Sequence, residues 1–200
     1  MSGSLFLSPM SISDSCDISQ MYEVLESLNM VAEPINQNPL LHSYRAGDGF
    51  AQHVIYAGCS PYLKFEPENE TDTAFCHVAL HASSTIPLIL TGKNTTKPRC
   101  PHCRARVEEW SLMLDAPSHQ CGKCGETFSP TEFDWRQQAA IGRCFIELRN
   151  VFPSEATPSD KLMALLKEKT GFEWRYAWAG ATNAESYRPS GTITSILIGK

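Results

Sequence analysis

The chain has 200 residues, a mass of 22.2 kDa and a formal net charge of -5, from 17 Lys and Arg against 22 Asp and Glu. Hydrophobic residues at 42% and charged residues at 20% match the usage of globular proteins and exclude general disorder. The acidic balance argues against wholesale non-specific binding of nucleic acid, and no apolar run is long enough to span a membrane, so no membrane partner is expected.

The N-terminal segment 1–16 is rich in serine. It has no Lys or Arg before its short apolar run, Leu5 to Leu7, so it lacks the pattern of a signal peptide. We therefore expect a flexible N-terminal arm over 1–16 and a cytoplasmic protein. In that compartment the eight cysteines are expected to be reduced unless they bind metal or do redox work.

A helix and several strands are predicted after the arm. Apolar residues from Ile18 to Leu28 follow helical spacing, with Asp17 or Ser15 available as the N-cap, and predict a short amphipathic helix. Segments rich in β-branched and aromatic residues, separated by turn signals, then predict an antiparallel meander. These segments are 53–58, 62–68, 73–82 and 86–92.

The second half of the chain mixes helices and strands. Ser129 and Glu132 form a capping box that predicts a helix over 129–142, and Ser159 and Gly171 delimit a second helix. Strands are predicted at 144–152, 173–180 and 192–199. The order of elements predicts an α+β fold with a mostly antiparallel sheet. Its main domain is expected over 17–92 and 129–200, interrupted by a Cys-rich insertion at 93–128.

Four of the cysteines form two close pairs with the spacing of a metal site. Two residues separate Cys100 from Cys103 and Cys121 from Cys124, and 17 residues, 104–120, lie between the pairs. Such short spacings let each turn present two sulfurs to one metal, and two turns complete a tetrahedron. The spacing predicts one structural zinc ion, because four sulfurs leave no open position for water or substrate, nor for His102 or His119.

The segment 97–128 resembles a zinc ribbon with a rubredoxin-like pair of knuckles. The resemblance rests on CPHC at 100–103 and CGKCG at 121–125, and it covers about a sixth of the chain. It implies that Cys100, Cys103, Cys121 and Cys124 are the zinc ligands. The first knuckle departs from the family pattern in one respect: glycine often follows the second cysteine, as Gly125 does, whereas Arg104 follows Cys103.

The CPHC sequence is also that of strongly oxidising thiol-disulfide enzymes, in which the Cys-x-x-Cys begins a helix after a strand. Here Pro98 and Arg99 precede Cys100, and no βαβ unit is evident. A thiol-disulfide oxidoreductase that uses Cys100 and Cys103 therefore stays as an alternative. The metal content of the purified protein distinguishes this enzyme from a zinc protein.

The insertion contains the strongest basic patch of the chain, in a stretch without acids. Its residues are Lys93, Lys97, Arg99, Arg104 and Arg106. These cations suit contact with phosphates, or they offset the negative charge of zinc with four thiolates. We expect a non-catalytic zinc protein whose ribbon builds or displays a surface for another protein, with nucleic-acid binding through 93–106 as an alternative. Trp110, Phe128 and Trp135 are expected to pack the insertion on the main domain.

An enzyme with a pocket in the main sheet is a further alternative. Its candidate residues are His53, Cys59, His77 and Arg143. Cys59 with a nearby histidine suggests a Cys-His nucleophile, but no third group that would orient the histidine is evident, so a buried structural cysteine is expected. His77 and His81 share one face of a predicted strand, which fits a polar sheet face or a second metal site.

Overall fold

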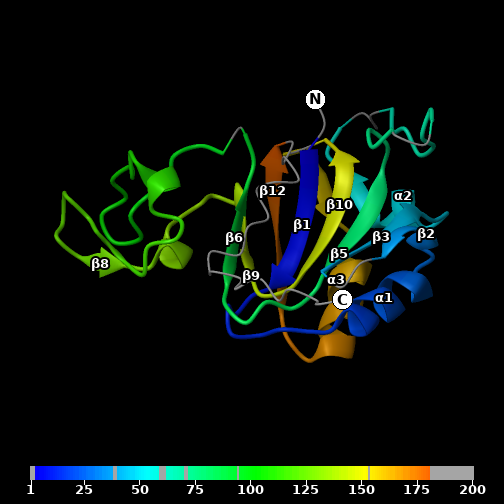
Figure 1. Cartoon of the computed structure of the whole chain (residues 1–200), viewed down its shortest axis with the longest axis horizontal. Coiled ribbons are helices and arrows are strands. Elements are labelled where there is room, and N and C mark those ends of the chain that lie inside the picture. The colour runs from blue at the N-terminus through cyan, green and yellow to red at the C-terminus, as the bar shows by residue number, and fades with distance from the viewer. Residues whose placement is uncertain are drawn as a thin grey trace, which may run out of the picture.

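A six-stranded sheet forms the centre of the fold in this computed structural model, which describes residues 3–37, 40–58, 62–69, 72–93, 95–152 and 154–180 (Figure 1). The strand order is β12-β1-β10-β5-β3-β2, and each neighbouring pair is antiparallel. The strands are β1 (Gly3–Pro9), β2 (Val31–Gln37), β3 (Leu41–Ala46), β5 (His77–His81), β10 (Phe145–Val151) and β12 (Trp174–Gly180).

The N-terminal segment is a strand and not a flexible arm. Residues 3–9 form β1, which lies between β10 and β12 and is buried along its whole length. Leu5 and Leu7 pack into the larger core cluster, while Phe6 points to the opposite side and joins a second cluster. The prediction of an arm over 1–16 was therefore wrong for this part, because a strand buried on both faces lacks the polar alternation of an exposed one.

Helices cover one face of the sheet. Helix α1 (Ile18–Ser27) and helix α3 (Asp160–Thr170) contribute Met21, Val24, Leu25, Leu162 and Leu166 to the larger core cluster. Both helices were predicted, and their ends follow the expected signals. The Ser159 hydroxyl accepts a hydrogen bond from the Leu162 N–H, and Gly171 closes α3 with a left-handed φ of 82°. A short helix, α2 (Phe50–His53), leads into β4 (Val54–Tyr56).

Three two-stranded ladders surround the main sheet in the described residues. β4 pairs with β11 (Ala156–Pro158), β6 (Leu88–Thr91) pairs with β9 (Ala139–Gly142), and β7 (His119–Gln120) pairs with β8 (Thr127–Phe128). The predicted meander over 53–92 was wrong, because β4, β5 and β6 each pair with distant strands. The described part of 62–68 holds no strand.

The predicted helix over 129–142 was also wrong. Its capping box forms, with the Ser129 N–H bonded to the Glu132 carboxylate, but only one 3-10 turn follows, η2 (Pro130–Glu132). The chain then buries Phe133 and Trp135 and continues into β9. Burial of these rings outweighs the helical signal of the local sequence.

The α+β prediction is confirmed, since strand residues at 35% outnumber helical residues at 18% and the strand pairings are antiparallel. The predicted strand over 192–199 lies outside the described residues. In the part of the chain that the structure describes, no helix is both long enough and apolar enough to cross a membrane.

The Cys-rich segment projects sideways from the main sheet (Figure 1). We call residues 95–135 the module. It contains the β7–β8 ladder and a second 3-10 turn, η1 (Trp110–Leu112). Arg99 pairs through its backbone with Arg106 and with Asp134, so the start and the end of the module are joined beside Cys100.

Candidate functional site: a four-cysteine metal centre

The two Cys-x-x-Cys turns have the same backbone hydrogen bonds. In the first turn the Cys100 N–H donates to the Ala105 carbonyl at 2.8 Å, and the Arg104 N–H donates to the Cys100 carbonyl at 3.0 Å. In the second, the Cys121 N–H donates to the Glu126 carbonyl at 2.8 Å, and the Gly125 N–H donates to the Cys121 carbonyl at 2.8 Å. The two turns are thus equivalent knuckles, each stabilised by its own backbone.

The departure at Arg104 does not change the geometry of the first knuckle. Gly125 has a φ of 76°, in the left-handed region that favours glycine, and Arg104 adopts a φ of 63° at the equivalent position. The Arg104 guanidinium also lies 2.9 Å from the Asp134 carboxylate, so the residue with the left-handed backbone forms an ion pair through its side chain. The first knuckle therefore keeps the required conformation with a non-glycine residue.

The four cysteine sulfurs converge on one point. Sulfurs of Cys100 and Cys124 lie 3.7 Å apart, as do those of Cys103 and Cys121, and all four sulfurs lie within 4.8 Å of one another. Four sulfurs bonded to a metal at about 2.3 Å define a tetrahedron with edges of about 3.8 Å, whereas a disulfide needs about 2.05 Å. The sulfurs could thus hold a metal ion, and the arrangement fits a knuckle pair.

Backbone groups favour a thiolate at Cys121. The N–H groups of Cys124 and Lys123 at the Cys121 sulfur lower the pKa of that thiol to about 6. Cys100 and Cys121 are buried, while Cys103 and Cys124 are partly exposed. The CPHC turn does not begin a helix, unlike the active-site turn of a thiol-disulfide oxidoreductase.

A hydrophobic cluster joins the module to the main domain. Phe133 and Trp135 pack with Ala139 and Ile141 of β9, and Trp110 meets the Trp135 ring edge-on at 5.4 Å between centroids. Phe128 also packs against this cluster. The three aromatic residues that were predicted to attach the insertion therefore do so.

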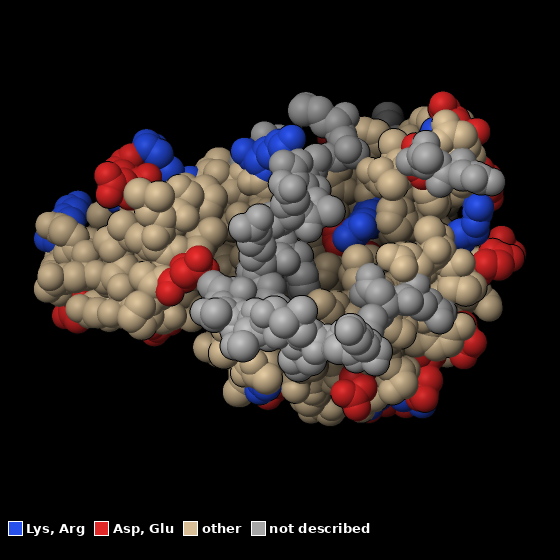
Figure 2. Space-filling view, viewed as in Figure 1, with Lys and Arg blue, Asp and Glu red and all other residues tan. Residues whose placement is uncertain are grey.

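Acidic side chains pair with part of the basic patch. Lys97 pairs with Glu108, and Arg104 pairs with Asp134. Figure 2 shows both cationic and anionic groups on the visible face of the module, and no continuous basic surface. Two of the five cations of the basic patch are thus already engaged with carboxylates of the module.

The described residues of the proposed sheet pocket each have a different polar partner. His53 Nδ1 lies 2.9 Å from the Ser159 hydroxyl beside α3, whereas His77 Nδ1 lies 2.8 Å from the Phe75 carbonyl. Arg149, near the C-terminal end of β10, is the register partner of His77. Arg143 precedes the N-terminal end of β10 and donates to the Ser84 carbonyl. Cys59 lies outside the described residues.

A buried charged cluster on the main sheet was missed from the sequence. Glu147, with only 1% of its surface exposed, accepts a hydrogen bond from Ser4 and lies within 2.9 Å of His81 and Arg149. His81 thus contacts a carboxylate, whereas His77 contacts a backbone carbonyl. Among described residues, the four cysteines are the group of metal-ligating side chains that comes together. The sequence did contain a signal for this cluster, because Glu147 and Arg149 are two charged residues on the same face of an apolar strand.

Comparison with known proteins does not place the chain in a family: no protein-family model, curated protein or solved structure matches it. The fold and the site define it instead. The chain is an α+β protein with a four-cysteine site that could hold a metal ion.

Proposed function

We propose that this protein binds one structural zinc ion through Cys100, Cys103, Cys121 and Cys124, and that the zinc-bound module displays a surface for a protein partner without catalysis of its own. The observation that carries the proposal is the convergence of four sulfurs from two equivalent knuckles. Zinc is the metal most often held by four thiolates in tetrahedral structural sites. A cytoplasmic location accords with this role, because the ligands must stay reduced.

A structural role explains why the module needs a metal. Its own hydrophobic cluster consists of a few side chains around Phe133 and Trp135, at the end of the module nearest β9. The knuckles lie in a part of the chain with only short strands and single helical turns. A metal bound to four side chains from both knuckles supplies the stability that so small a core lacks.

An exposed leucine on the module favours a protein partner. Leu112 lies in η1 with 80% of its surface exposed, while the adjoining Trp110 packs on Trp135 and fixes the turn. Glu108, four residues before Leu112, forms an ion pair with Lys97. An apolar side chain among charges of both signs suits a protein surface better than a phosphate backbone, which requires unpaired cations.

Metal analysis of the purified full-length protein tests the first half of the proposal. We expect one zinc ion per chain, and we expect Cys103→Ser to lose it. Cys76→Ser is the matched control, because Cys76 is a free cysteine whose thiol donates to the Asn150 carbonyl, a bond that a serine hydroxyl also makes. Metal-free protein with a reversible Cys100–Cys103 disulfide would support the oxidoreductase alternative instead.

Affinity purification with and without nuclease tests the second half. We expect a protein partner that survives nuclease and is lost with Leu112→Asp. Ile86→Asp is the control, because Ile86 is also an exposed apolar residue but lies outside the module. A complex that nuclease dissolves, and that Leu112→Asp leaves intact, would favour nucleic-acid binding through residues 93–106.

A further inference from the structure

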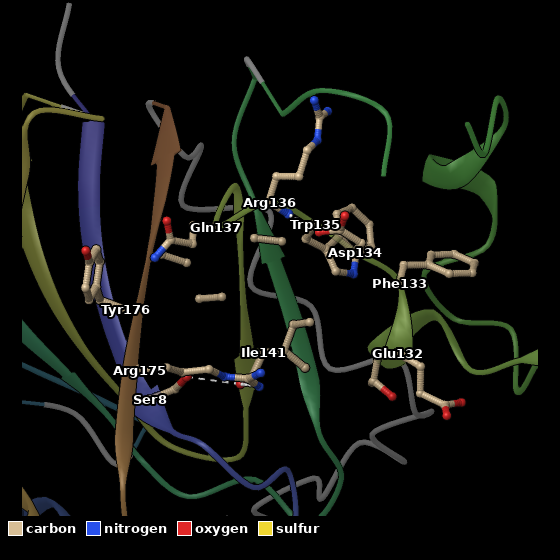
Figure 3. A pocket seen from close by; sticks show the side chains of 14 residues that line it. Ser8, Glu132, Phe133, Asp134, Trp135, Arg136, Gln137, Ile141, Arg175 and Tyr176 are labelled. Carbon is tan, nitrogen blue, oxygen red and sulfur yellow. Dashed lines mark hydrogen bonds between the residues drawn. The ribbon is translucent and has the colours of Figure 1, made fainter. Parts of the chain in front are cut away.

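A cavity of about 270 Å³ lies where the module meets the main sheet (Figure 3). One wall is formed by residues 131–137 of the module and its continuation, and the other by β9, β12 and Ser8 of β1. A cavity of this volume is of the size that binds a small organic molecule.

Arg175 supplies a cationic group to this cavity. Its side chain reaches from β12 toward β9, and its Nη2 donates to the Ile141 carbonyl at 2.7 Å (Figure 3). Burial lowers the pKa of Arg175, which reflects the cost of removing a guanidinium from water. Arg175 is partly buried, and within the described part of the chain no carboxylate pairs with it.

The two acids that line the cavity have other partners. The Glu132 carboxylate accepts the Ser129 N–H at 2.7 Å. The Asp134 carboxylate pairs with Arg104 and accepts the Arg136 N–H at 3.1 Å. Both acids are thus used to hold the module, and no described carboxylate neutralises the positive charge of Arg175.

The cavity wall also contains a strained backbone. Arg136 and Gln137 are consecutive non-glycine residues in the left-handed region, with φ of 51° and 60°. The Trp178 N–H donates to the Gln137 carbonyl at 2.7 Å and holds this segment against β12. Such conformations persist where neighbours enforce them, and they concentrate at ligand sites.

We propose that this cavity binds a small monocarboxylic acid, with Arg175 as the partner of the carboxylate. The Arg136 guanidinium donates to Thr96 and to the Lys97 carbonyl, so Arg175 is the guanidinium left for a ligand. It balances a single negative charge, and its planar donors suit a carboxylate. Glu132 and Asp134 at the wall disfavour a doubly charged phosphate. Ala140, Ile141 and Ala177 provide apolar surface for the body of the acid. This site is separate from the metal centre and does not depend on the proposed function.

Binding of phenylacetate to the full-length protein, followed by NMR, tests the proposal. We expect saturable binding, with shifts centred on the amides of residues 135–141 and 175–177. Phenylacetamide has the same shape without the charge and should bind at least about tenfold more weakly. A tripeptide ending in phenylalanine is the second arm. Tighter binding of this peptide than of phenylacetate would overturn the assignment to a small acid in favour of a peptide terminus.

Two variants of Arg175 and a control variant of Arg143 distinguish binding in the cavity from non-specific effects of removing an arginine. Arg175→Gln should abolish the preference for phenylacetate over phenylacetamide, and Arg175→Lys should retain part of it. Arg143→Gln is the control, because Arg143 also donates to a backbone carbonyl but lies outside the cavity. Absence of saturable binding by the wild type at millimolar phenylacetate, shifts confined to other regions, or an unchanged preference in folded Arg175→Gln would each overturn the proposal.

Discussion

His81 Nε2 lies 2.8 Å from the Glu147 carboxylate, across two neighbouring strands of the main sheet. Glu147 pairs in register with Ala79, so His81 is its diagonal neighbour on the same face. Burial alone would raise the pKa of Glu147, but the hydrogen bond from His81 and the charge of Arg149 more than offset this and lower it to about 2. The sheet thus holds an ionised carboxylate in its interior.

This ion cluster makes stability depend on pH. Because the pKa of Glu147 is lower in the folded protein than its ordinary value of 4.5, its ionised form stabilises the fold above pH 4.5. That contribution is lost as the pH falls from 4.5 to about 2. We expect Glu147→Gln to lower the free energy of unfolding by about 3 kcal/mol at pH 7, and the difference from wild type to shrink in acid.

Urea titration at several pH values measures this difference. Glu168→Gln is the control, since Glu168 is exposed on α3. The account of Glu147 is contradicted by a Glu147→Gln difference that stays constant from pH 7 to acid, or by equal losses in both variants.

The glycines of the second knuckle predict a contrast in stability. Gly125 has a φ of 76° and Gly122 has no positive φ, and a Cβ atom at either position would meet nothing within 4 Å. Gly125→Ala should therefore destabilise the module by about 1–2 kcal/mol through backbone strain alone, whereas Gly122→Ala should not. Hydrogen exchange of the module amides measures both. Equal effects of the two substitutions would show that the left-handed turn is not required.

Removal of the metal is expected to loosen the module and leave the main domain folded. The larger core cluster spans α1, α3 and the main sheet and includes no cysteine of the metal site. We therefore expect a chelator to increase hydrogen exchange in residues 97–128 while β1, β5 and β10 stay protected. Unfolding of the whole chain on chelation, or unchanged exchange in the module, would contradict this division.

Cys76 should be inert in the folded protein. Burial raises the pKa of its thiol to about 11, so little thiolate exists near neutral pH. We expect iodoacetamide at pH 8 to leave Cys76 unmodified in the native state and to modify it in urea, as measured by mass spectrometry of its peptide. Rapid labelling of Cys76 in the native state would mean that this part of the sheet opens.

Local signals predicted the parts of the fold that local interactions decide. The caps at Ser159 and Gly171 delimit α3, and the Cys-x-x-Cys spacing predicted the four cysteines that come together. The helix expected after Ser129 failed because Phe133 and Trp135 gain more from the module core than the segment gains from helical bonds. The strand at 3–9 was missed because its neighbours come from positions near 147 and 177.

The interacting charged groups of the main domain could not be located from the sequence for a related reason. Glu147 and His81 are 66 residues apart, and Arg175 meets Ile141 across 34 residues. Nothing local indicates that these side chains share a face or a cavity, since strand order decides it. The metal site is different, because each half of it lies within one tight turn.

X-ray absorption at the zinc edge of the purified full-length protein tests the central claim most directly. The four-cysteine site predicts zinc with four sulfur neighbours at about 2.3 Å and no nitrogen or oxygen neighbour. Protein without zinc, or zinc with nitrogen or oxygen in place of one or more sulfurs, would contradict the structural site that Cys100, Cys103, Cys121 and Cys124 define.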